Sequence, residues 1–205
     1  MEVDIIKRII NILIVLMVSM MVFAPATYAW GGATHRNIAT AVYNHLPNNV
    51  KANLNLDIMK NSSRDPDLKF KDYENHIYPG SVSKAKEWLN KGKQAYAAGK
   101  YNAASYDFGV ASHYIADTGC APHCVTGEGN LHAVYETQAN KLTPAISFLD
   151  VIHPSDSIKT MLENENGFGT CDWNIWIDYG RTDDAIQDNL NYATSIAYVL
   201  IKKYI

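Results

Sequence analysis

Apolar residues recur at helical intervals along most of the chain after residue 29. Between residues 34 and 46 they stand four positions apart, with Thr34 as a candidate N-cap, until Pro47 ends the pattern. The same period runs through residues 83–98 and 101–118. Three helices are therefore expected in this half of the chain.

The segments around these helices are less regular. Residues 48–82 contain two prolines and predict a long loop with one short helix. Two or three helices are expected between residues 131 and 164, followed by a glycine-rich segment at 167–180 and a last helix that starts near Thr182. No alternating strand pattern, internal repeat or linker occurs. The sequence predicts an all-α fold, a single multi-helical domain over residues 30–205.

The first 29 residues have the pattern of an export signal. Two basic residues precede an apolar run at 9–23, and the small residues at 27–29 suit a signal peptidase. A signal peptide at 1–29 predicts a secreted or extracytoplasmic protein that begins at Trp30. Acidic residues near the start leave an uncleaved N-terminal membrane anchor as the alternative.

Charge and composition narrow the classes of function. The chain has 18 basic and 21 acidic residues, a net charge of −3, and 47% hydrophobic residues, which excludes a disordered chain. Duplex nucleic acid is not an expected partner, because such binding normally needs a basic surface. An enzyme that acts on a phosphodiester would need positive charge from another source, such as a metal.

Histidines and acids are spaced as metal ligands. His113 precedes Asp117 by four residues, and His132 precedes Glu136 by four, with His123 between the two pairs. Side chains four apart share one face of a helix and can hold a cation together. The alternative is that these are surface or capping histidines with incidental salt bridges.

Further candidate ligands lie earlier in the chain. The loop contributes Asp65, Asp67 and then His76, and the expected mature terminus contributes Trp30 and His35. A free terminal amine and its own carbonyl can chelate a metal in a five-membered ring. Nitrogen and oxygen donors of these kinds suit zinc.

Three cysteines, Cys120, Cys124 and Cys171, occur in this chain, which is expected to be exported. One disulfide is expected, either Cys120–Cys124 or one of these with Cys171, which leaves one thiol unpaired.

With these motifs the chain resembles the zinc-dependent phospholipases C of bacteria, which are related to the three-zinc nucleases specific for single strands. The resemblance covers residues 30–136. Its most specific part is the string from His113 to His123, which fits H-x3-D-x5-H with a proline before the last histidine. It implies a mostly helical zinc-dependent phospholipase C-like domain that binds about three zinc ions.

The resemblance also implies the ligands of each zinc. The three sets are Trp30, His35 and Asp117; Asp67, His76, His113 and the shared Asp117; and His123, His132 and Glu136. Asp65 remains an alternative to Asp67. The Trp30–His35 spacing is more like the nucleases, whereas a glutamate at the last position is more like the phospholipases.

The implied activity is hydrolysis of phosphodiester bonds by metal-activated water, with Asp67 orienting or deprotonating that water. A phospholipase C acting on phospholipid head groups, with transient contact to a membrane surface, is favoured. A three-zinc nuclease acting on single-stranded nucleic acid and a non-catalytic zinc-binding secreted protein are the alternatives. The sequence indicates neither substrate-binding residues nor an oligomeric state.

Overall fold

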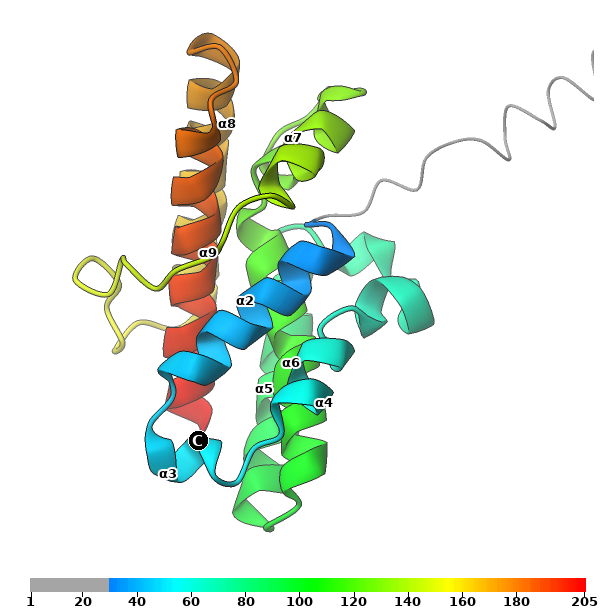
Figure 1. The fold of residues 1–205 in the computed structure, drawn as a ribbon, viewed down its shortest axis with the longest axis vertical. Helices are drawn as coiled ribbons and strands as arrows, with labels where there is room; N and C mark the ends of the chain where they lie inside the picture. The colour runs from blue at the N-terminus through cyan, green and yellow to red at the C-terminus, as the bar shows by residue number, and fades with distance from the viewer. Residues whose placement is uncertain (1–29) are drawn as a thin grey trace, which may run out of the picture.

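The computed structural model of the protein describes residues 30–205, so the expected signal peptide at 1–29 lies outside the described residues. The described chain is helical and contains no β-strand, which confirms the predicted all-α fold (Figure 1). Its α-helices are α2 (Gly32–His45), α3 (Asn48–Lys51), α4 (Leu56–Ser62), α5 (Gly80–Ala97), α6 (Tyr101–Gly119), α7 (Leu131–Ala139), α8 (Ile158–Asp178) and α9 (Asp183–Tyr204). The other helical segments are the π-helix η1 (Pro66–Phe70) and the 3-10 helices η2 (Tyr73–Asn75) and η3 (Ala121–Cys124).

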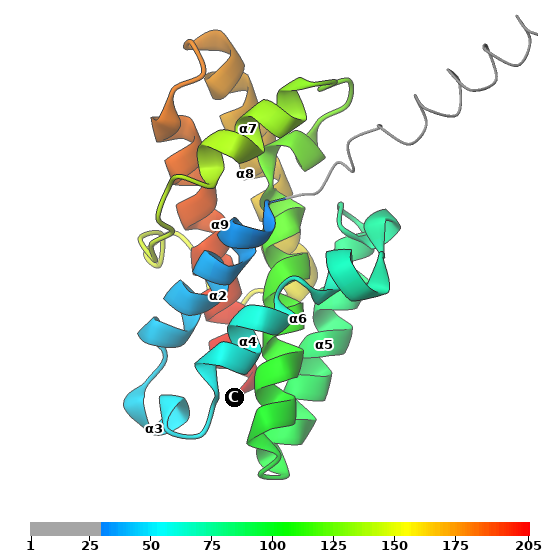
Figure 2. The ribbon, with the colours of Figure 1, turned by 45° about the vertical axis from the view of Figure 1, so that its right-hand side comes forward.

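Helix α6 is the centre of the fold. It packs against α5, α9, α4, α8 and α2, and the different views show it enclosed by them (Figures 1 and 2). Every residue from Phe108 to Gly119 is buried. Polar residues in this half of α6, including His113 and Asp117, are therefore held away from solvent by the surrounding helices.

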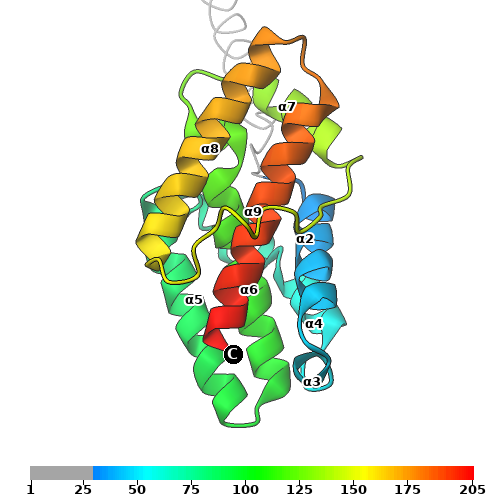
Figure 3. The same cartoon turned by 90° about the vertical axis from the view of Figure 1, so that its left-hand side faces the viewer.

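The last helix supplies much of the core opposite α6. α8 and α9 form an antiparallel pair, seen side by side in Figure 3. Ile186, Leu190 and Leu200 are fully buried on α9, as their four- and ten-residue spacing predicts. Truncating one such leucine or isoleucine to alanine typically costs about 2–5 kcal/mol of stability.

The segment between α2 and α5 contains more helix than its sequence predicts. It forms α3 and α4 as well as η1 and η2, whereas only one short helix was expected. The side chain of Asn55 accepts a hydrogen bond from the Ile58 amide and so caps the start of α4. The segment brings Asp67 and His76 over α6.

The predicted break at residues 167–180 is wrong, because α8 continues through Gly167 and Gly169 as far as Asp178. Gly169 packs against the end of α6. A Cβ atom there would overlap the carbonyl oxygen of Gly119 and lie 2.6 Å from Cys124 Sγ. This glycine therefore serves close helix packing rather than a turn.

The expected disulfide is also absent, since the three cysteines are free. The Cys124 thiol instead donates to the carbonyl oxygens of Thr118 and Cys120, at 3.3 and 3.4 Å. Cys120 is fully buried whereas Cys171 is exposed on α8, so these two are not placed to pair. Within residues 30–205, no helix has the length and apolar character needed to cross a bilayer.

Candidate metal centre

The centre is built on one turn of α6. His113 and Asp117 lie on the same face of the helix, with His113 Nε2 3.1 Å from Asp117 Oδ2, and neither side chain is exposed to solvent. The Nδ1 atom of His113 lies 2.8 Å from the carbonyl oxygen of Ser63. A proton on Nδ1 donated to this carbonyl leaves Nε2 as the atom available to bind a metal.

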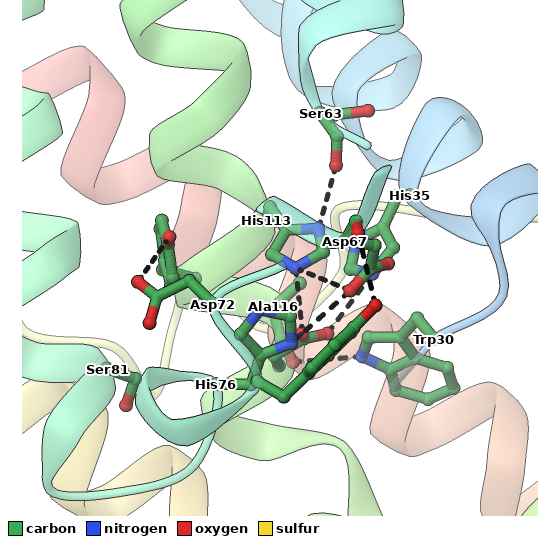
Figure 4. Close-up of polar contacts among 12 residues, drawn as sticks. Trp30, His35, Ser63, Asp67, Asp72, His76, Ser81, His113 and Ala116 are labelled. Carbon is green, nitrogen blue, oxygen red and sulfur yellow. Dashed lines mark hydrogen bonds and ion pairs between the residues drawn. The ribbon is translucent and has the colours of Figure 1, made fainter. Parts of the chain in front are cut away.

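Helix α2 supplies the opposite side of the carboxylate. His35 Nε2 lies 3.2 Å from Asp117 Oδ1, and the His35 ring stacks on the His113 ring with centroids 3.9 Å apart. The start of the helix is anchored beside them, because the buried Trp30 indole donates from Nε1 to the Ala116 carbonyl at 2.9 Å (Figure 4). Asp117 therefore faces a histidine with each of its oxygens.

The segment from η1 to α5 completes the first cluster. His76 Nδ1 lies 3.1 Å from Asp117 Oδ2 and 3.5 Å from Asp67 Oδ1, and Asp67 Oδ1 is also 3.7 Å from His113 Nε2 (Figure 4). Asp65, the alternative to Asp67, pairs instead with Lys69 at 2.8 Å. The carboxylate that faces the histidines is that of Asp67.

Two groups of three potential metal ligands emerge from this cluster, each with its donor atoms within 4.8 Å of one another. They are His35, Asp67 and His113, and His76, His113 and Asp117. The first group joins His35 to residues that the resemblance assigns to a different zinc. The five side chains therefore act as one continuous cluster of donors rather than two separate sites.

A second cluster lies at η3 and α7. The rings of His123 and His132 are 5.2 Å apart, and His132 Nε2 is 2.9 Å from Glu136 Oε1. On its other side, Nδ1 of His132 lies 3.7 Å from Glu128. Glu128 was not predicted as a site residue, although it precedes His132 by four residues, the same spacing that singled out Glu136.

The two clusters open onto a common pocket. A cavity of about 230 Å³ is lined by His76 from the first cluster and by His123, His132 and Glu128 from the second. A small group that enters this pocket can therefore meet donors from both clusters.

In the absence of metal, burial and neighbouring charges set the charge states of the acids and histidines. It raises the pKa of Asp67 to about 6 and that of Glu136 to about 7. For Asp117 burial acts in the same direction, but the charges of His113 and His35 outweigh it and hold its pKa well below the usual range. Burial lowers the pKa of His123 to about 4, so this imidazole is neutral at pH 7 and able to bind a metal.

The donors fit zinc in both chemistry and bonding. Imidazole nitrogens and carboxylate oxygens are typical zinc ligands. Several of these atoms are buried without a hydrogen-bond partner, among them Nε2 of His76, Oδ1 of Asp67 and both oxygens of Asp117. Buried polar atoms without partners are costly, and a cation held between them would satisfy these nitrogens and oxygens together.

The helical fold and the buried histidine–aspartate clusters define a class of helical proteins with metal-binding centres. Within that class, the family described as zinc-dependent phospholipase C matches residues 34–178, more than two-thirds of the chain. The chain belongs to the zinc-dependent phospholipase C family. Comparisons with curated proteins and with solved structures gave no match.

Proposed function

We propose that this protein is a zinc-dependent phospholipase C that hydrolyses phospholipids at the bond between the glycerol oxygen and phosphorus. The observation that carries the proposal is the position of Asp117, whose two oxygens face His35 on one side and His76 and His113 on the other. Such a carboxylate can bridge two cations. Its location in a chain of this family supports a phosphodiesterase function rather than a purely structural role.

The proposed zinc ligands are the nine side chains or terminal groups implied by the sequence. The shared cluster would hold two ions through Trp30, His35, Asp67, His76, His113 and Asp117, and His123, His132 and Glu136 would hold a third. Zinc bound here would neutralise the phosphate charge and acidify a water molecule. The histidines and carboxylates of the shared cluster are already buried and face one another, so little reorganisation is required on binding.

The chain's own residues have distinct tasks in this reaction. Asp67 is 4% exposed and lies at the inner end of the π-helix, where it can orient a water and accept its proton. The pocket shared by the clusters would receive the phosphate beside donors of both. Because the chain has a net charge of −3, the phosphate would be attracted by the bound metal rather than by basic side chains.

We also propose that the protein is exported. Removal of residues 1–29 would free the amine of Trp30, whose indole is fixed against α6 next to Asp117. The same cleavage would thus deliver the protein outside the cytoplasm and complete its first zinc site. A chain that retained these residues would have no terminal amine to offer there.

Parallel assays on a phospholipid and on single-stranded DNA test the proposal. The zinc-loaded protein should release diacylglycerol from phosphatidylcholine, lose this activity with chelator, and regain it with zinc. Asp117→Asn should be inactive, whereas Asp57→Asn, a change at an exposed acid on α4, should retain activity. Cleavage of the DNA without hydrolysis of the lipid would favour the nuclease alternative, and no hydrolysis of either would favour a zinc-binding protein without turnover.

A further inference from the structure

The segment that carries Asp67 and His76 also carries a concentration of exposed apolar side chains. Large hydrophobic residues that are at least 36% exposed number eleven among residues 30–205, and four of them lie between positions 68 and 77. These four are Leu68 (53% exposed), Phe70 (39%), Tyr73 (45%) and Ile77 (45%). Exposed apolar residues are ordinary when scattered, but a group of them marks an interaction surface.

Two members of this apolar group lie at the pocket beside the metal centre. Tyr73 and Ile77 line the 230 Å³ pocket together with His76, His123 and His132. Asp67 directly precedes Leu68, and His76 directly precedes Ile77. A partner that rests on Tyr73 and Ile77 therefore lies beside His76 and the histidines of the second cluster.

The segment is held firmly in this position. The Phe70 ring stacks on the Trp88 ring of α5 with centroids 5.5 Å apart and planes 5° from parallel. The Asp72 carboxylate accepts a hydrogen bond from the Tyr114 hydroxyl at 2.9 Å and pairs with Lys84 at 3.2 Å. Leu68 and Ile77 thus belong to an anchored segment, and about half of each side chain is exposed to solvent.

Basic residues alternate with the apolar ones. Lys69 and Lys71 flank Phe70, and both are exposed. Lys69 pairs with Asp65 at 2.8 Å, so Lys71 is the lysine offered to lipid phosphates, while its apolar neighbours lie deeper. Of the two acids that follow, Asp72 is occupied by Tyr114 and Lys84, which leaves Glu74 as the exposed acid between residues 68 and 77.

We propose that residues 68–77 form a membrane-docking surface that rests on a phospholipid bilayer, with Leu68 and Ile77 at the acyl boundary and Lys71 among the phosphates. This inference rests on the proposed function, since it describes how the lipid reaches the centre. A bilayer fits better than a folded protein partner because the surface combines apolar tips with an exposed lysine and abuts a pocket that would receive a head group. Shallow insertion by a few side chains gives reversible contact rather than anchoring.

Vesicle flotation tests the surface. The zinc-loaded protein is mixed with vesicles of phosphatidylcholine, with or without a minor fraction of anionic phosphatidylglycerol. Replacement of both Leu68 and Ile77 by serine should weaken vesicle binding about tenfold, as expected for removing two half-exposed apolar side chains from a lipid contact. Lys71→Gln should reduce the preference for the anionic vesicles. Zinc content and melting temperature of each variant show whether it is folded.

A matched control uses exposed apolar residues elsewhere. Leu149 and Val151, 40% and 55% exposed, belong to the loop between α7 and α8. This loop lies on the opposite side of the molecule from η1 and η2 (Figures 1 and 3). Replacing both by serine should leave vesicle binding unchanged. Equal loss in this control, or wild-type binding by the folded Leu68/Ile77 variant, would overturn the proposal.

Separate measurements test the docking surface and the proposed function independently of each other. If the wild-type protein hydrolyses a monomeric short-chain phosphatidylcholine but does not float with vesicles, the docking surface is wrong and the activity stands. If it floats with vesicles through Leu68 and Ile77 but hydrolyses no phospholipid, the surface stands and the activity is wrong. Self-association that these substitutions abolish, with no vesicle binding, would assign the surface to a second copy of the chain and overturn the proposal.

Discussion

Asp117 Oδ1 lies 3.2 Å from the Nε2 atom of His35, and both side chains are buried although the two residues are 82 positions apart in the chain. The other oxygen of Asp117 faces His76 and His113, each at 3.1 Å. A carboxylate between histidines on two sides is suited to bridge two zinc ions. Glu136, by contrast, contacts His132 alone among the proposed ligands, at 2.9 Å.

This difference predicts unequal effects of removing the two charges. Asp117→Asn should disturb two zinc positions and lower phospholipid hydrolysis by more than about 100-fold, whereas Glu136→Gln should weaken one zinc and lower it about tenfold. Added zinc should partly restore the Glu136 variant but not the Asp117 variant. Activity measured across a zinc titration checks this, and equal rescue of both would show that Asp117 is not a bridge.

The N-terminus gives a prediction about metal content. If the Trp30 amine and carbonyl bind zinc, the isolated protein should begin at Trp30, and a variant with extra residues ahead of Trp30 should contain one zinc fewer. N-terminal sequencing and metal analysis of the two forms provide the measurement. A start downstream of Trp30, or equal metal content in both forms, would remove the terminal amine from the ligand set.

Metal removal should destabilise the fold. The centre joins α2, the segment from η1 to η2, and α6 through buried donors, and zinc that binds only the folded state stabilises it by mass action. Chelation should lower the melting temperature by about 10 °C. Calorimetry with and without chelator measures the shift. An unchanged melting temperature, with no zinc in the untreated protein, would argue against the proposed set of zinc ligands.

The spacing of ligands along α6 could be predicted from the sequence, because residues four apart in a helix share a face whatever surrounds them. The contact between His35 and His113 could not, since it depends on how α2 packs against α6. The resemblance placed both residues among the ligands, but their stacked rings, 3.9 Å apart, appear only in the fold. Local periodicity thus gives the donors of one helix but not the partners from other helices.

The loop carrying Asp65 and Asp67 shows a second limit. Residues 66–70 form a π-helix, whose repeat differs from the 3.6-residue period used to predict helical faces. Asp65 turns to Lys69 and Asp67 turns to the histidines, a distinction that spacing alone does not make. Similarly, Glu128 precedes the start of α7, so its contact with His132 depends on the turn between η3 and α7 and not on a helical face.

Asp172 on α8 predicts how stability depends on pH away from the metal ligands. Burial and the nearby charge of Asp188 raise the pKa of Asp172 from 3.8 to about 7, despite a hydrogen bond from Asn189. The folded protein retains this proton after the unfolded chain has released it. The free energy of unfolding should therefore fall as pH rises between about 4 and 7, and stay lower above pH 7.

Asp172→Asn should flatten this dependence and make the protein about 1 kcal/mol more stable at pH 8. Asp178, exposed near the end of the same helix, is the control, and Asp178→Asn should leave the pH profile as it is. Urea unfolding at pH 5, 6, 7 and 8 measures both variants. A profile for Asp172→Asn parallel to that of the wild-type protein would contradict the assigned protonation.

Anomalous X-ray scattering, recorded above and below the zinc absorption edge on crystals of the mature protein grown without chelator, locates the metal directly. The bridging role of Asp117 predicts two zinc peaks, one at about 2 Å from each carboxylate oxygen, with His35 beside one and His113 or His76 beside the other. A third peak is expected between His123, His132 and Glu136. Zinc-loaded crystals with no peak within bonding distance of Asp117 would contradict the proposed centre.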